Sequence, residues 1–250
     1  MPDNWRLLGA SLTGRAHEQR GLPNQDALAA ASRLDGHLLL AVADGAGSAP
    51  LSAEGAELAC RTAIACLSAV PTPEPEPALR LALAKAATAV HSHARRAGKP
   101  ARDYACTLLL AVASDRFVSG LQLGDGAVVT ATAGGLERLT PGWRSTYAGE
   151  TVFLTSPGAA GLASVASRPA AEVSGIALLT DGLEPVATDL ASGRPFGPFF
   201  EPLFRFAAGS LDAGLQAGRT RQLEALLGSD RIRSRTHDDT TLLLAARGTA

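Results

Sequence analysis

Short apolar runs of strand length dominate the first half of the chain and return at its end. The runs predict strands at 6–13, Ala27–Leu34, His37–Ala43, Cys106–Ala113, Phe117–Leu123, Ala127–Ala133, Ile176–Leu179 and Thr241–Ala245. The dipeptide Asp35–Gly36 separates the second run from the third, which is typical of a tight hairpin.

Helical patterning occupies two other stretches. Residues 51–70 are rich in Ala, Leu and Glu, and a second helix is expected at 78–97. Between them, the segment PTPEPEP at 71–77 is expected to be a stiff connector, because proline lacks the backbone N–H that a helix interior needs. Residues 183–227 are expected to be mainly helical with a break around 193–198, whereas 17–23 and 141–170 have the composition of surface loops.

The order of the predicted elements indicates the fold class. Strands, a helix pair, more strands and then helices favour an α+β fold in packed layers. No internal repeat is evident, and the proline-rich connector is too short to separate domains. We therefore expect one domain over residues 1–250.

Composition narrows the class of protein. Hydrophobic residues make up 46% of the chain, enough for a substantial core, and the formal net charge is −1. That balance provides no electrostatic footprint for nucleic acid or an anionic membrane. The three cysteines, Cys60, Cys66 and Cys106, form no CxxC motif and are expected to be small buried side chains. We expect a cytoplasmic protein with neither a nucleic-acid nor a membrane partner.

Acidic residues gather where predicted strands end. Three apolar runs stop at Asp-Gly, namely LLLAVADG at Asp44, LQLGDG at Asp125 and IALLTDG at Asp181. Asp26 precedes the second strand, and the pair Asp238–Asp239 precedes the last one. Several carboxylates at one rim would repel one another unless a divalent cation bound between them. Hard cations such as Mg²⁺ and Mn²⁺ prefer such oxygen ligands, so the pattern predicts a metal site.

The order of the motifs resembles a known family. NQDA (24–27), VADGAGSA (42–49), ACTLL (105–109), LGDG (123–126), LLTDGL (178–183) and DDTTLLL (238–244) are similar to the motifs of the type-2C metal-dependent protein phosphatases, in particular a bacterial subgroup with the DGAGSA form. The resemblance covers nearly the whole chain. It implies a four-layer αββα sandwich, in which two antiparallel β-sheets are flanked by helix pairs.

The resemblance also implies roles for individual residues. Asp44 would bridge two cations, Mn²⁺ or Mg²⁺, with the carbonyl of Gly45 as a further ligand, and Asp181 and Asp238 would complete the first metal site. Asp26 would belong to the second site, and Asp125 with Asp181 to a weaker third one. Asp44, Asp181 and Asp238 are the expected catalytic set. Thr107 and Gly182 would support the site.

Three departures from the family pattern concern the expected metal ligands and the phosphate contact. Gln25 stands where the family has Glu, which removes a charge from the second metal site. Gly21 occupies the place of the phosphate-binding Arg, so His17 or Arg20 is expected near the phosphate, with Arg15 close by. Asp239 replaces the usual Asn, and either Asp238 or Asp239 could therefore face the metals. His237 could orient one of these carboxylates.

The predicted function is hydrolysis of phosphoserine and phosphothreonine in proteins. A hydroxide shared by two cations would attack phosphorus directly, while the cations and a basic group stabilise charge on the phosphoryl oxygens. A serine/threonine kinase is the partner that the resemblance suggests. The alternative is a pseudophosphatase that binds a phosphoprotein or kinase as a regulator, because Gln25 and Gly21 depart from the catalytic pattern.

Overall fold

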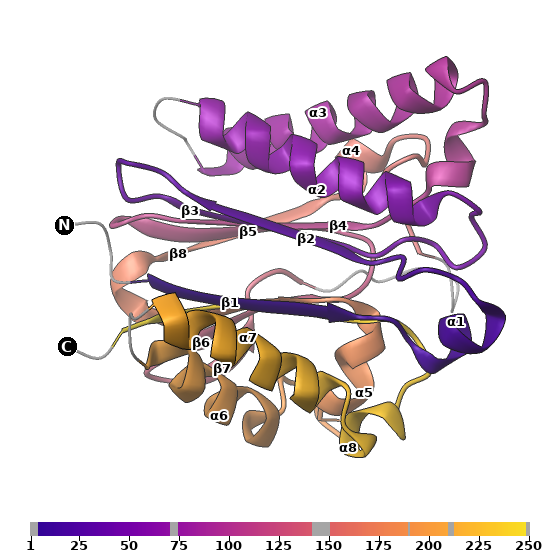
Figure 1. Ribbon diagram of the computed structural model, residues 1–250. Coiled ribbons are helices and arrows are strands. Elements are labelled where there is room, and N and C mark those ends of the chain that lie inside the picture. Colours follow the sequence, from indigo (N-terminus) through magenta and orange to yellow (C-terminus); the bar gives the residue numbers. More distant parts are fainter. Residues whose placement is uncertain (1–4, 71–74, 142–150, 190, 210–212, 249–250) are drawn as a thin grey trace.

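The computed structural model describes residues 5–70, 75–141, 151–189, 191–209 and 213–248. Within them, two five-stranded antiparallel sheets pack face to face (Figure 1). The first has the order β1-β10-β9-β6-β7 and the second β2-β3-β4-β5-β8. The strands are β1 (Trp5–Leu12), β2 (Ala27–Ser32), β3 (Leu38–Ala43), β4 (Leu108–Ala113), β5 (Phe117–Leu123), β6 (Ala127–Thr132), β7 (Gly135–Arg138), β8 (Ser164–Pro169), β9 (Val173–Leu179) and β10 (Thr240–Arg247).

The central strands are apolar throughout because both of their faces are buried. In β3, Leu38, Leu40 and Val42 belong to the core between the two sheets. The alternate residues Leu39 and Ala41 belong to a separate core beneath helices. Successive side chains of a strand point to opposite faces, so a strand between two cores reads LLLAVA rather than as an apolar–polar alternation.

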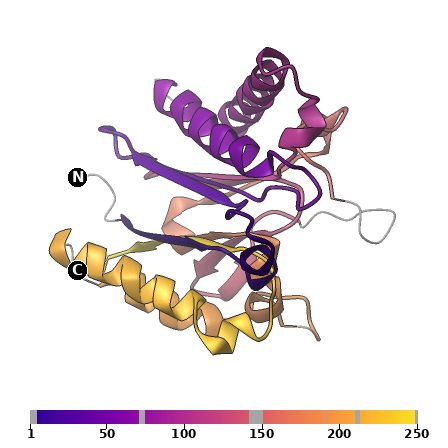
Figure 2. The same ribbon diagram turned by 45° about the vertical axis from the view of Figure 1, so that its right-hand side comes forward.

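Helices form the two outer layers. Figure 2 shows α2 and α3 outside the second sheet, and α6 and α7 outside the first. The helices are α1 (Arg15–Arg20), α2 (Ser52–Ala69), α3 (Pro75–Arg96), α4 (Ala159–Leu162), α5 (Glu184–Ala187), α6 (Gly197–Ala208), α7 (Ala213–Leu227) and α8 (Asp230–Arg233), with 3₁₀ turns η1 (Ala101–Tyr104), η2 (Ala170–Glu172) and η3 (Asp181–Leu183). The expected αββα sandwich is confirmed. None of the helices in the described ranges has the length and hydropathy needed to cross a bilayer.

Several predicted boundaries were wrong. Helix α3 begins at Pro75, inside the expected connector, because a proline in the first helical turn loses no intrahelical hydrogen bond. The stretch 141–170 contains strand β8, which pairs with β5, and the expected loop 17–23 overlaps α1. Strand β7 was not predicted. Residues 71–74 of the connector and 142–150 of the expected loop lie outside the described residues.

Candidate functional site

Three strands deliver carboxylates to one end of the sandwich. Asp44 follows β3, Asp125 lies in the turn between β5 and β6, and Asp181 follows β9 at the start of η3. One carboxylate oxygen from each of the three lies within 4.8 Å of the others. The turn at Asp125 has glycines with positive φ on both sides, Gly124 at 88° and Gly126 at 86°, a conformation that other residues rarely adopt.

Burial and close approach raise the pKa values of Asp44 and Asp181. Burial raises the pKa of Asp44 well above its ordinary range, and the carboxylates of Asp26, Asp181 and Asp125 raise it further. Burial also raises the pKa of Asp181, although a hydrogen bond from Asp44 partly opposes that shift. Oδ1 of Asp181 is buried without a hydrogen-bond partner among the described residues. Ionising all of these carboxyl groups together is therefore unfavourable unless a positive charge lies among them.

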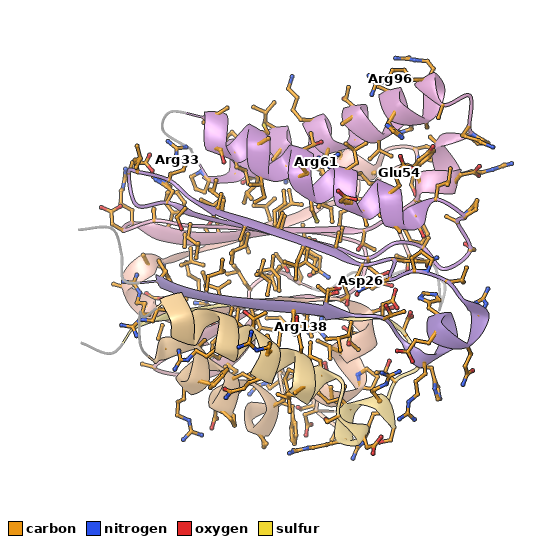
Figure 3. All side chains as sticks on the ribbon, in the orientation of Figure 1. Asp26, Arg33, Glu54, Arg61, Arg96 and Arg138 are labelled. Atoms are coloured by element: carbon orange, nitrogen blue, oxygen red, sulfur yellow. The ribbon has the colours of Figure 1, made fainter. Side chains whose placement is uncertain are left out.

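Asp26 lies between the two sheets at the end nearest α1 (Figure 3). Its Oδ2 accepts hydrogen bonds from the hydroxyls of Thr180 at 2.8 Å and Thr241 at 2.7 Å. Burial raises the pKa of Asp26 to about 8, against the opposing effect of the two hydroxyls. The charges of Asp239 and Asp181 add to the increase. Asp26 thus belongs electrostatically to the same acidic centre.

The loop after β3 is fixed by tight backbone contacts. The hydroxyl of Thr107 accepts a hydrogen bond from the amide of Asp44 at 2.9 Å, and the amide of Thr107 donates to the Asp44 carbonyl at 2.8 Å. The amide of Gly45 donates to the Gln25 carbonyl at 3.1 Å, and a Cβ at Gly45 would lie 2.6 Å from that oxygen. Only glycine fits there, and Thr107 holds the backbone of Asp44 through its hydroxyl and its amide.

The turn that carries Asp125 is held from beneath by Gln122. The Gln122 amide nitrogen donates to the carbonyls of Gly124 and Gly126, each at 3.1 Å, and its oxygen accepts from the Thr140 hydroxyl at 2.7 Å. Thr151 donates to Oδ2 of Asp125 at 2.6 Å. The buried side-chain amide of Gln122, with both its nitrogen and its oxygen hydrogen-bonded, therefore holds the backbone of this turn in place.

Arg138 connects this turn to the segment after Asp181. Its guanidinium donates to the Gly126 carbonyl at 3.2 Å and to Oε1 of Glu184 at 2.9 Å. Glu184 is the first residue of α5, three positions after Asp181. The two acidic turns are thus joined through one side chain.

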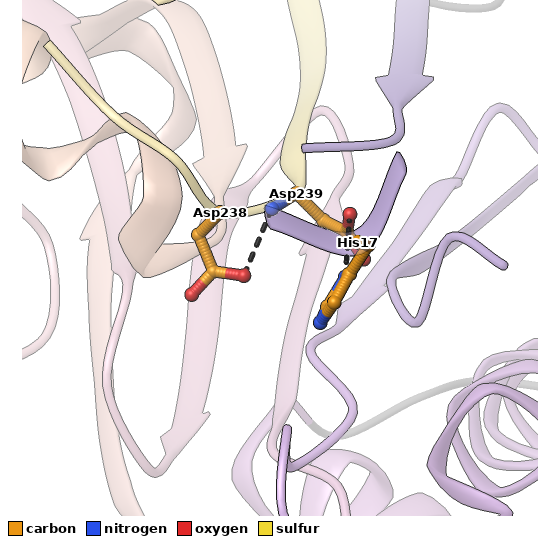
Figure 4. Close-up of side chains that lie close together, drawn as sticks. All are labelled: His17, Asp238 and Asp239. Carbon is orange, nitrogen blue, oxygen red and sulfur yellow. Dashed lines mark hydrogen bonds and ion pairs between the residues drawn. The ribbon is translucent and has the colours of Figure 1, made fainter. Parts of the chain in front are cut away.

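The adjacent aspartates before β10 differ in environment. Asp239 is buried, and its two oxygens accept the amides of Gly14 and Gln25, each at 2.6 Å. The Nδ1 atom of His17 lies 2.9 Å from Oδ1 of Asp239, an ion-pair distance without hydrogen-bond angles (Figure 4). Asp238 is exposed and accepts only the amide of Asp239 at 2.9 Å among the described contacts, and its charge acts on Asp181. His17, Asp238 and Asp239 form a second potential ligand group.

The other expected site residues lie around this centre. Gln25 is buried, and its Oε1 has no hydrogen-bond partner among the described residues. Gly182 packs so closely on the Asp239 carbonyl that any side chain would overlap with it. Arg20 is exposed at the end of α1, and no described residue forms an ion pair or hydrogen bond with its side chain. Gly21 ends α1 with φ of 66°, and a Cβ there would meet open space.

Four residues that support the site were not singled out in the sequence. Thr180 and Thr241 hold Asp26, while Gln122 and Arg138 hold the Asp125 turn. Thr180 and Thr241 do stand next to the acidic motifs, which was an available signal. Gln122 was also visible as a polar residue inside an apolar strand.

The donor set fits divalent cations. It offers several carboxylates, the unpaired Oδ1 of Asp181 and the unpaired Oε1 of Gln25, all of them hard oxygen ligands. A bound cation would also favour the ionised forms of Asp26, Asp44 and Asp181, whose pKa values are raised by burial and, to a smaller extent, by neighbouring carboxylates.

Comparison with known proteins agrees with this geometry. The family model described as "Protein phosphatase 2C" matches residues 13–228. The chain is 34% identical to serine/threonine-protein phosphatase 3 of Escherichia coli (strain K12), over 97% of this chain and 98% of that protein. The catalytic domain of the serine/threonine protein phosphatase PstP, solved with two manganese ions, has a TM-score of 0.66 at 19% identity, covering 98% and 99% of the two chains. The serine/threonine phosphatase Stp1 of Staphylococcus aureus has a TM-score of 0.66 at 15% identity, covering 96% and 94%. The chain therefore belongs to the protein phosphatase 2C family, the metal-dependent serine/threonine protein phosphatases.

Proposed function

We propose that this chain hydrolyses phosphoserine and phosphothreonine side chains of proteins with the help of divalent cations at one end of its β-sandwich. The observation that carries the proposal is the convergence of Asp44, Asp125 and Asp181 within 4.8 Å of one another. A structural role alone does not account for this arrangement. Negative charges so close together repel one another, and burial of Asp44 and Asp181 makes their ionised forms still less favourable.

Two Mn²⁺ or Mg²⁺ ions would be held by Asp44, the Gly45 carbonyl, Asp181, Asp238 and Asp26. Asp125 and Asp181 are the residues for a third, weaker ion. When bound, such cations lower the pKa of a coordinated water and neutralise charge on a phosphoryl group. Thr107, Thr180 and Thr241 keep Asp44 and Asp26 in place through hydroxyl hydrogen bonds, so the ligands do not reorganise as the reaction proceeds.

We assign different roles to Asp238 and Asp239. The oxygens of Asp239 are already taken by two backbone amides, which supports an anchoring role in place of the expected metal ligation. Asp238 is exposed and close enough for its charge to act on Asp181, which supports metal ligation. His237, also exposed, remains a candidate for orienting Asp238.

His17 is the better of the two candidates for a position near the phosphate. It is buried within the second acidic group, whereas Arg20 is exposed on α1. The Nδ1 atom of His17 lies 2.9 Å from Oδ1 of Asp239, which keeps the ring beside the acidic centre where a phosphate would bind. A kinase that phosphorylates the same proteins remains the expected functional partner.

The test is phosphate release from a phosphothreonine peptide with Mn²⁺, with Mg²⁺ and with EDTA, for the natural protein and for Asp44→Ala. Metal-dependent release that Asp44→Ala abolishes is the expected result. The regulator alternative predicts peptide binding without release at any metal concentration. Full release in EDTA or in Asp44→Ala would overturn the proposal.

A further inference from the structure

An apolar groove runs through the outer helical layer beside the first sheet. It lies between α5, α6, α7 and α8 and encloses about 870 Å³. Aromatic and aliphatic side chains line it, namely Phe196, Phe199, Leu203, Phe206, Leu226 and Ile232. Phe199, Phe206 and Leu226 are only partly buried, although they pack against the core of this layer. A volume of this size has room for several bulky side chains of a ligand.

Two walls of the groove belong to segments that continue along the chain to acidic residues of the site. Pro185 and Val186 line one wall, and they follow Asp181 by four and five positions. Ser234 and Arg235 line another, and Arg235 precedes Asp238 by three positions. Figure 1 shows α5 and α8 at the same end of the sandwich as α1, where the acidic centre lies. A polypeptide with one residue at that centre could therefore extend into the groove.

The rim of the groove carries positive charge. Arg231 and Arg235 line it and are exposed, and neither forms an ion pair with any described residue. Arg233, between them in sequence, is already paired with Glu18. The acidic residue in the lining, Asp189, uses its Oδ1 to accept the amide and hydroxyl of Ser192. The rim is therefore complementary to an acidic ligand.

We propose that this groove docks the phosphoprotein substrate. Its occupant is a segment of the substrate outside the phosphorylated residue, with bulky apolar side chains for the groove and acidic side chains for Arg231 and Arg235. The proposal rests on the proposed function, because the bound segment is part of the substrate. Docking would lower the KM for proteins that carry the segment without changing the chemistry at the aspartates.

The first experiment measures binding directly. Fluorescent peptides of Leu, Phe and Glu are compared with the same peptides carrying Lys in place of Glu, by anisotropy in EDTA. We expect the natural protein to bind the acidic peptide and Arg231→Glu/Arg235→Glu to bind it about tenfold more weakly. Arg95→Glu/Arg96→Glu, with the same change in net charge on exposed residues of α3, is the matched control and should bind normally. Phe199→Ala tests the apolar wall, with thermal unfolding to confirm that the variant folds.

The second experiment links docking to turnover. A phosphothreonine peptide is joined to the acidic segment by a Gly/Ser linker of about 10 residues and compared with the unjoined phosphopeptide and with p-nitrophenyl phosphate. We expect a KM about tenfold lower for the joined peptide, an advantage that Arg231→Glu/Arg235→Glu removes while p-nitrophenyl phosphate hydrolysis stays normal. Equal binding of acidic and basic peptides, or self-association of the protein that Phe199→Ala abolishes, would overturn the docking proposal. Selective peptide binding without hydrolysis of any substrate would instead overturn the proposed function.

Discussion

Oδ2 of Asp239 accepts a hydrogen bond from the backbone amide of Gln25 at 2.6 Å, across a separation of 214 residues. Oδ1 of the same carboxylate accepts the amide of Gly14 at 2.6 Å. Asp239 thus fastens both ends of the segment between β1 and Asp26 to the strand that carries Asp238. Asp239, next to the proposed metal ligand Asp238, therefore fixes the backbone beside Asp26, a second proposed ligand.

Asp238 and Asp239 can be separated by experiment. Asp239→Ala leaves two buried amides without acceptors and should lower the free energy of unfolding by about 2–4 kcal/mol, measured by urea denaturation in EDTA. Asp238→Ala removes an exposed carboxylate and should change that free energy by less than about 0.5 kcal/mol. Asp238→Ala should instead weaken Mn²⁺ binding measured by calorimetry. If Asp238→Ala destabilised the protein and Asp239→Ala did not, the assignment of the two roles would be reversed.

Asp44 should oppose folding when no metal is bound. Asp44→Asn removes one of the mutually repelling carboxylates, so the melting temperature in EDTA should rise, while the increase on adding Mn²⁺ should shrink. Phosphatase activity should fall at least about 100-fold. Asp35→Asn is the matched control, since Asp35 also precedes a glycine but lies in an exposed hairpin with Arg33 and His37. Its activity should stay normal.

The stability of the metal-free protein should decrease as the pH rises. Asp26 has its pKa raised from 3.8 to about 8 in the folded state, mainly by burial. Between these values the folded state holds a proton that the unfolded state has lost, so stability falls with pH through this window and levels off above pH 8. One such group accounts for about 4 kcal/mol between pH 5 and pH 8.

Urea denaturation in EDTA at several pH values measures this decrease. The variant Asp26→Asn should show a shallower dependence, and saturating Mg²⁺ or Mn²⁺ should reverse the trend, because cations compete with protons for the carboxylates. A metal-free protein whose stability rose from pH 5 to pH 8 would contradict the described crowding.

The sequence predicted the main acidic residues because each ends an apolar run. Asp44, Asp125 and Asp181 follow β3, β5 and β9, and these strands deliver them to one end of the sandwich. Thr180 and Thr241 stand beside acidic motifs, but their pairing with Asp26 could not be predicted from the local pattern. The bonds of Asp26 to Thr180 and Thr241 span 154 and 215 residues and depend on how the strands meet in space.

Strand β8 shows why some elements were missed. Its sequence SVASRP lacks a run of large apolar residues, and it lies at the edge of the second sheet, bonded on one side only, to β5. An edge strand needs less apolar surface than a central one, so composition alone gave it the appearance of a loop.

The Asp125 turn should depend on the Gln122 amide. Gln122→Glu removes the NH₂ group that donates to Gly124 and Gly126 and places an acidic oxygen against two carbonyls. We expect a loss of about 2–4 kcal/mol in stability and weaker Mn²⁺ binding by calorimetry. Gln222→Glu, at an exposed position of α7, is the matched control and should change neither quantity. Normal metal binding in a folded Gln122→Glu protein would show that the turn does not need this amide.

Any side chain at Gly182 should destabilise the fold, because this position is too closely packed to hold a Cβ atom. A Cβ at Gly182 would overlap with the Asp239 carbonyl, which belongs to the backbone and cannot rotate away. Gly182→Ala should therefore cost at least about 2 kcal/mol of unfolding free energy and displace the neighbouring Asp181, weakening Mn²⁺ binding. Gly47→Ala adds the same methyl group where nothing lies within 4 Å and should leave stability within about 0.5 kcal/mol. Urea denaturation of both variants, followed by Mn²⁺ titration, compares a crowded glycine with an uncrowded one. Equal stability of the two variants would mean that Gly182 does not pack directly against the Asp239 carbonyl.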